Sequence, residues 1–172
     1  MDFKFLNSKL LENVDRLNFY LFYHGYDLYE FLSDTLDHLK QSNSIFIINY
    51  DDKIIEKINK DGAHKIYETE TAKRYNLYLQ KNVIFHISSK VLLLDLITNK
   101  ISSDLIGYII VGNHKSIEID SKEIFILKYL LNNSTNTKFI LINNNPNMFV
   151  QDFQIIKRNH LLTNNNLDRK ST

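Results

Sequence analysis

Histidine is the main candidate for metal or acid–base chemistry in this sequence, because the chain contains no cysteine. The lack of cysteine excludes a disulfide scaffold, a thiolate nucleophile and a thiolate-ligated metal site. No two histidines stand at a spacing that would bind zinc, and no G-x-S-x-G nucleophile motif occurs. We therefore expect no catalytic residue, no metal and no cofactor. The six histidines are His24, His38, His64, His86, His114 and His160.

Two loops could in principle bind a nucleotide, and neither has the residues to do so. A phosphate-binding loop needs several glycines and a Lys-Ser/Thr pair, whereas the segment 24–27 contains only Gly25. Asp27 also places a carboxylate where the next helix would otherwise attract a phosphate. The segment 112–115 has no acidic residue that could hold Mg²⁺ for a triphosphatase. The sequence thus predicts nucleotide-type loops without ATP chemistry.

The pattern of apolar residues predicts strands and helices that alternate along the chain. Short runs that are apolar on both faces are typical of buried parallel strands, and spacings of three and four residues predict helices. This alternation predicts one α/β domain, doubly wound, with a mostly parallel sheet over residues 1–162 and a disordered tail over 163–172. Residues 91–97 fit either a strand or a buried helix. The expected strands are 19–23, 44–48, 63–67, 83–87, 108–111 and 138–142, and the expected helices are 1–15, 27–39, 51–58, 69–80, 120–131 (capped by Asp120) and 149–162.

The charges are nearly balanced, which limits the kinds of partner the chain could attract. The 172 residues include 21 Lys and Arg against 20 Asp and Glu, a formal net charge of +1. A broad positive field of the kind that attracts nucleic acid is therefore absent, and any nucleic-acid face must be local. No run of about 18 uncharged apolar residues occurs, so we expect no membrane span.

The stretch 81–131 resembles the N-terminal helicase-like region of the XPF family, the xeroderma pigmentosum group F structure-specific DNA repair endonucleases. After an apolar strand, Ser88-Ser89-Lys90 stands where that family has a Thr-Ser-Arg-like turn. Lys100-Ile101-Ser102-Ser103-Asp104-Leu105-Ile106 is similar to the family's basic-Ile-Pro-Ser-Asp-Leu-Ile element, with Ser102 in place of proline. Glu123 to Lys128 is similar to the family's Glu-Ala-Phe-Ile-Leu-Arg, and 145–149 matches more weakly.

The resemblance implies a single RecA-like lobe, a degenerate superfamily 2 helicase-like fold that has lost its phosphate loop and acidic ATPase box. The lost motifs correspond to segments 24–27 and 112–115. Family members work in the nucleus in nucleotide excision repair, with a second lobe, a nuclease domain and C-terminal modules that bind a heterodimer partner. We find none of these in the chain, and so expect a fragment, a split gene product or a truncated homologue without ATPase or nuclease activity.

By this resemblance the lobe would dock junction DNA and repair scaffold proteins for a nuclease domain. Small hydroxyls and a cation can approach phosphates closely, so the expected DNA-binding residues are Ser88, Ser89, Lys90 and Lys115. One alternative is a protein-interaction scaffold that makes no DNA contact. Another is an unrelated α/β enzyme, which would require a pocket with a perturbed acid at a strand end. Basic residues scattered over several faces would favour the scaffold; the residues to compare are Lys73, Arg74, Lys90 and Lys115.

Overall fold

Six parallel strands form the central sheet of the protein. The computed structural model describes residues 16–22, 28–40, 44–50, 53, 56, 64–66, 71–112 and 115–159. The strand order is β1-β6-β5-β2-β4-β3, and every neighbouring pair is parallel. This arrangement confirms the expected α/β fold with a parallel sheet. The strands are β1 (Leu17–Leu21), β2 (Ile45–Ile48), β3 (His64–Ile66), β4 (Ile84–Ile87), β5 (Tyr108–Val111) and β6 (Lys138–Asn143).

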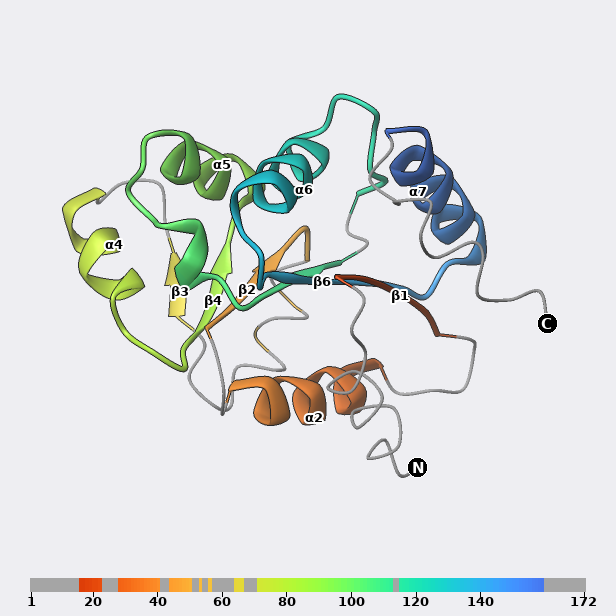
Figure 1. Cartoon of the computed structure of the whole chain (residues 1–172). Helices are drawn as coiled ribbons and strands as arrows, with labels where there is room; N and C mark the ends of the chain where they lie inside the picture. Colours follow the sequence, from red (N-terminus) through yellow and green to blue (C-terminus); the bar gives the residue numbers. More distant parts are fainter. Residues whose placement is uncertain are drawn as a thin grey trace.

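Helices cover both faces of the sheet, as a doubly wound fold requires. One face carries α2, whereas α5, α6 and α7 lie side by side on the other, and α4 lies beyond the β3 end (Figure 1). A short 3₁₀ helix, η2 (Ser103–Leu105), precedes β5. The α-helices are α2 (Leu28–Lys40), α4 (Thr71–Tyr78), α5 (Ser89–Ile97), α6 (Lys122–Asn133) and α7 (Pro146–Arg158).

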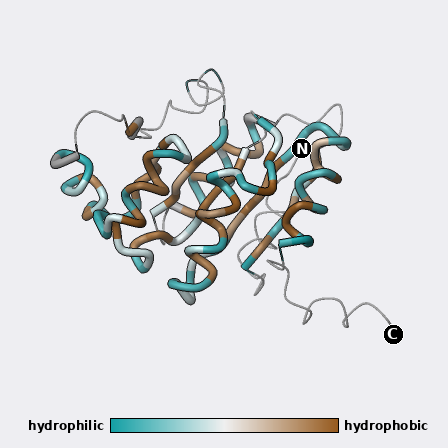
Figure 2. Tube along the Cα trace, turned by 90° about the horizontal axis from the view of Figure 1, so that it is seen from above, coloured by the Kyte–Doolittle hydropathy of each residue, from teal (hydrophilic) through white to brown (hydrophobic). Residues whose placement is uncertain are grey.

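The strands are apolar on both faces because each face packs against its own helical layer. Along β2, Phe46 and Ile48 belong to the core beneath α4–α7, whereas Ile45 and Ile47 belong to the core above α2. Successive side chains of a strand point to opposite faces, so this alternation divides one apolar run between two cores. The brown strand segments at the centre of Figure 2 show the same concentration of hydrophobic residues.

Helix boundaries differ from the sequence prediction where local capping decides them. The segment 91–97 is a helix, and α5 begins after Ser88, whose hydroxyl accepts a hydrogen bond from the backbone N–H of Val91 at 3.3 Å. Ser121, and not the predicted Asp120, caps α6 by accepting from the N–H of Ile124. A hydroxyl cap of this kind satisfies an N–H group that the helix leaves unpaired.

The first strand and the last helix also begin earlier in the sequence than predicted. The first strand covers Leu17–Leu21, two residues earlier than predicted, and α7 starts at Pro146, three residues earlier. Asn145 caps α7 and proline follows at the first helical position, where its missing N–H costs nothing. The predicted helices 1–15 and, apart from 53 and 56, 51–58 lie outside the described residues, as do the tail 163–172 and the loop 24–27.

Candidate functional site

The turn Ser88-Ser89-Lys90 lies at the carboxyl end of β4, where a doubly wound sheet usually binds its ligands. Both serine hydroxyls already make contacts within the protein. Ser88 caps α5, and the buried Ser89 donates a hydrogen bond to the carboxylate of Glu123 at the start of α6. Lys90 is exposed in the first turn of α5. Lys90 is the cation among these three residues, and its exposed position is where a phosphate could approach.

Lys115 lies beyond the end of β5, and a residue from the end of β2 fixes its position. The side-chain amide of Asn49 donates to the carbonyl oxygens of Gly112 at 3.0 Å and Lys115 at 2.8 Å. Its Oδ1 accepts from the N–H of Lys115 at 3.2 Å. Asn49 has φ 58°, in the left-handed region that asparagine tolerates better than most residues. The sequence analysis missed this positioning role; an asparagine directly after a strand was its only signal.

Close packing between β2 and β5 holds the same loop against the sheet. A Cβ added to Gly112 would lie 2.6 Å from the ring of Tyr50 and 2.7 Å from the carbonyl oxygen of Asn49, so glycine is needed for this approach. Tyr50 is buried, and its hydroxyl has no hydrogen-bond partner among the described residues. Burial raises the pKa of this phenol, which keeps it protonated.

Strand order brings Lys90 and Lys115 to the same edge of the sheet. β4 and β5 flank β2, so their carboxyl ends lie about 10 Å apart, twice the spacing of neighbouring strands. Arg74, a third basic residue weighed in the sequence analysis, is only 4% exposed and belongs to the interior. Lys73 is exposed on α4 at the far end of the sheet. The basic residues therefore do not form one continuous surface.

Arg74 is buried because it forms a bidentate ion pair between α4 and α5. Its Nε and one terminal nitrogen each lie 2.9 Å from a different oxygen of Asp95, which is fully buried. Tyr78 donates its hydroxyl to the same carboxylate at 2.8 Å. The hydrogen bonds to Asp95 raise the pKa of the Arg74 guanidinium, and burial raises the pKa of the Tyr78 phenol. This network fixes α4 against α5.

A second buried acid, Asp152, connects α7 to the carboxyl end of β6 and to the segment between β5 and α6. One carboxylate oxygen accepts from the N–H of Ile117 at 3.1 Å, and the other accepts from the side-chain amide of Asn143 at 3.3 Å. Burial raises the pKa of Asp152, while these two hydrogen bonds lower it. Because both oxygens bind to the protein's own groups, Asp152 acts as a structural clamp.

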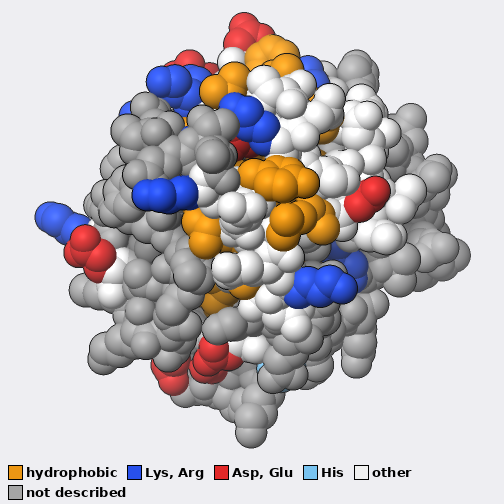
Figure 3. Space-filling view, turned by 90° about the vertical axis from the view of Figure 1, so that its left-hand side faces the viewer, with side chains coloured by type: hydrophobic (Ala, Val, Ile, Leu, Met, Phe, Trp, Pro, Cys, Tyr) orange, Lys and Arg blue, Asp and Glu red, His pale blue; other side chains and the backbone are white. Residues whose placement is uncertain are grey.

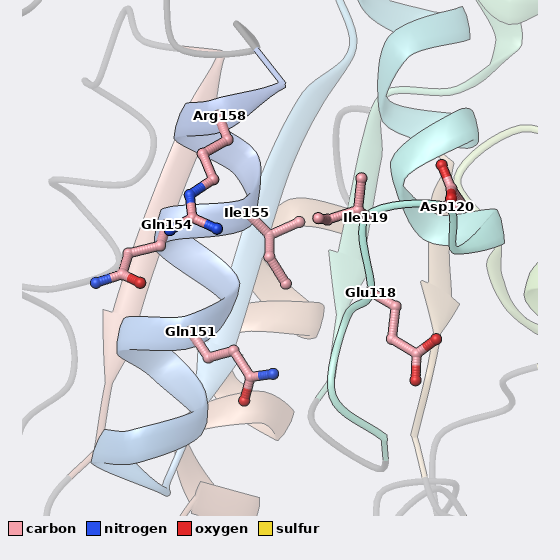
Figure 4. Close-up of a pocket in the computed structure, with 7 residues that line it drawn as sticks. All are labelled: Glu118, Ile119, Asp120, Gln151, Gln154, Ile155 and Arg158. Carbon is pink, nitrogen blue, oxygen red and sulfur yellow. The ribbon is translucent and has the colours of Figure 1, made fainter.

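A groove of about 440 Å³ runs between α7 and the segment that leads into α6 (Figure 4). Glu118 and Asp120 lie on one wall, and Arg158 lies on the other together with two glutamines of α7. The groove does not include Asp152, the described acid whose pKa burial raises. This groove is therefore not the pocket with a perturbed acid that the enzyme alternative requires. The full lining is Glu118, Ile119, Asp120, Gln151, Gln154, Ile155 and Arg158.

Neither a metal site nor a membrane-spanning helix is found in the part of the chain that the structure describes. There, no three histidine, aspartate or glutamate side chains come together in a way that could hold a metal ion. Within the same ranges, every helix is too short or too polar to cross a membrane.

Comparison with known proteins identifies a fold but no family. No family model matches the sequence, and no curated protein matches it. Among solved structures, the chain is similar to the crystal structure of the Pyrococcus furiosus Hef helicase domain, with a TM-score of 0.64 at 9% sequence identity. The match covers 88% of this chain and 36% of that one. The protein therefore has a helicase-like fold, and the chain spans about a third of the length of the structure it matches.

Proposed function

We propose that this chain is a noncatalytic helicase-like lobe of the XPF type that docks DNA junctions and partner proteins for a nuclease domain. The observation that carries the proposal is the placement of Lys90 and Lys115 on opposite sides of β2, at the ligand-binding edge of a helicase-like fold. The role in nucleotide excision repair, the nuclear location and a heterodimer partner come from the sequence resemblance alone.

The chemistry at this edge favours contact with phosphates over readout of bases. Lys90 and Lys115 are exposed cations, and Asn49 fixes the backbone that carries the second of them. Phosphate contacts position a protein on DNA but carry no sequence information. The carboxylate of Glu123, bonded to Ser89, would repel a phosphate that came too close to the start of α5. DNA binding should thus be weak and independent of sequence.

A scaffold without DNA contact is the second candidate, and the burial of Arg74 favours it. With Arg74 paired to Asp95, the described basic residues are spread over separate elements. Separate lysines suit the rim of a protein interface better than a continuous track along a phosphate backbone.

Fluorescence anisotropy of a labelled splayed-arm duplex separates the two candidates. We expect the wild-type chain to bind in the non-specific range of about 10⁻⁴ to 10⁻⁶ M, and Lys90→Glu or Lys115→Glu to weaken binding equally for unrelated base sequences. Lys157→Glu is the matched control, because Lys157 is an exposed lysine in the last turn of α7, away from the carboxyl edge. If all three variants bind like wild type, the DNA contact is wrong and the scaffold is favoured.

A further inference from the structure

Helices α4 and α5 leave large apolar side chains in solvent on one side of the molecule. Figure 3, which views the molecule from the α4 side, shows apolar side chains gathered in the middle of this face with both basic and acidic side chains around them. Four apolar residues in or directly after these two helices are each at least half exposed. Exposed apolar surface of this kind, with a polar rim, is typical of an interaction site. We call the four residues the α4–α5 strip: Tyr75 (51%), Leu79 (53%), Leu94 (50%) and Ile97 (60%).

The buried ion pair brings the two halves of the strip together. Arg74 and Tyr78 both contact Asp95, which defines the sides on which α4 and α5 face each other. On α4, Tyr75 comes directly after Arg74, and Leu79 comes directly after Tyr78, the last residue of that helix. On α5, Leu94 comes directly before Asp95. One residue is a rotation of about 100° around a helix, so these neighbours turn from the contact toward solvent. The apolar side chains therefore flank the same helix–helix junction.

The junction is rigid, so the strip is a preformed surface. Three hydrogen bonds of 2.8–2.9 Å hold Asp95 to α4. The ring of Tyr78 packs edge to face on Phe85 of β4, with centroids 5.7 Å apart. A surface that is already ordered loses little entropy when a partner binds.

The charges of the segment that carries the strip are mainly positive. The structure describes residues 71–107 without a gap, and in this range the buried Arg74 and Asp95 neutralise each other. The remaining charged residues are four lysines against one acid: Lys73, Lys81, Lys90, Lys100 and Asp104. Lys90 also stands four and seven residues before Leu94 and Ile97, which places it on the same stripe of α5.

We propose that the α4–α5 strip docks an amphipathic, acidic α-helix of a partner protein. Apolar residues at i, i+3, i+4 and i+7 of such a helix would cover the strip, and its glutamates or aspartates would face the surrounding lysines. Leu79, Leu94 and Ile97 have no group that could hydrogen-bond a base or a phosphate, which favours a protein partner over nucleic acid. The apolar residues of the strip take no part in the DNA contact proposed at the carboxyl edge, and Lys90 is the residue that the two proposals share.

A synthetic fluorescent helix with a leucine stripe and glutamates elsewhere tests the proposal on the whole chain. We expect it to bind with a dissociation constant of about 10–100 µM, as for a contact built on a few apolar anchors, and less tightly as salt increases. The double variant Leu94→Gln/Ile97→Gln should weaken binding by about tenfold or more. Phe125→Gln is the matched control, because Phe125 is 52% exposed on α6, outside the strip.

Two further measurements make the outcome decisive. Circular dichroism should show that the double variant is folded, and its affinity for the splayed-arm duplex should equal that of wild type. The proposal is overturned if Phe125→Gln weakens binding as much as the double variant does. It is also overturned if a lysine-substituted helix binds as well as the acidic one. Loss of duplex or anionic-vesicle binding in the double variant, without binding of the acidic helix, would assign the strip to those ligands instead.

Discussion

The ion pair between Arg74 and Asp95 offers the sharpest test of how the helices are held together. Replacing Arg74 by Met keeps most of the side-chain volume but leaves a fully buried carboxylate with a hydrogen bond from Tyr78 alone. Removing one partner of a buried ion pair usually costs about 3–5 kcal/mol. For a domain whose total stability is on the order of 5–15 kcal/mol, this is a large part of the free energy of unfolding.

The companion variants separate the charge from the packing. Tyr78→Phe removes one hydrogen bond to a charged group and should cost about 1.5–3 kcal/mol. The triple variant Arg74→Met/Tyr78→Phe/Asp95→Leu removes both charges and also the hydroxyl that would otherwise lose its acceptor, so its stability should lie within about 1 kcal/mol of wild type or above it. Asn76→Met is the control on the same helix, since Asn76 is exposed and should change stability by no more than about 0.5 kcal/mol.

Urea unfolding followed by circular dichroism measures these differences as changes in the free energy of unfolding. The expected ranking is Arg74→Met as the least stable, followed by Tyr78→Phe, with the triple variant near wild type. If Arg74→Met costs less than about 1 kcal/mol, or if the triple variant is as unstable as Arg74→Met, the carboxylate is not held in the way described.

Three further variants test the contacts near the carboxyl edge. Asn49→Ala should lower the free energy of unfolding by about 2–3 kcal/mol, because it loses the hydrogen bonds to the Lys115 loop and places alanine at φ 58°. Asn49→Gly loses the same hydrogen bonds but tolerates this angle, so it should cost about 1–2 kcal/mol. Equal costs of the two variants in urea unfolding would mean that the backbone angle is not decisive. For Asp152, burial raises the pKa in the folded state above the ordinary value of about 3.9, so folding favours the protonated form. The stability that this proton contributes is fully present below about pH 3.9 and is lost as the pH rises through the pKa of the folded state. Relative to Asp152→Asn, wild type should therefore be more stable at pH 4 than at pH 7 in urea unfolding, and a constant difference would contradict the raised pKa.

The fold could be predicted from the sequence because its main signal is local. Runs such as 45–48 are apolar on both faces, a pattern that is typical of a strand covered by two helical layers. Strand order depends on contacts between distant segments, and so it was not predictable from periodicity. The placement of β6 between β1 and β5 is an example. Capping was partly visible, but several polar residues near the start of α6 could each have served as the cap.

The candidate site was less predictable, because its geometry depends on pairs that are far apart in the chain. In the sequence, Lys73-Arg74 resembles a solvated basic pair, and nothing links Arg74 to Asp95, 21 residues later. The bond between Ser89 and Glu123 is hidden in the same way, since it joins two helices. Residue type and loop position located Lys90 and Lys115 at one edge of the sheet. Which side chains remained available there depended on the folded structure.

The dependence of DNA affinity on salt tests the proposed function most directly. Two phosphates neutralised by Lys90 and Lys115 should give a slope of log affinity against log salt of about −2, since each duplex phosphate contributes about −0.9. The predicted result for Lys90→Glu is a slope shallower by about one unit with splayed-arm duplexes of any sequence. A slope near zero for wild type, or a slope that Lys90→Glu leaves unchanged, would contradict phosphate docking at this edge.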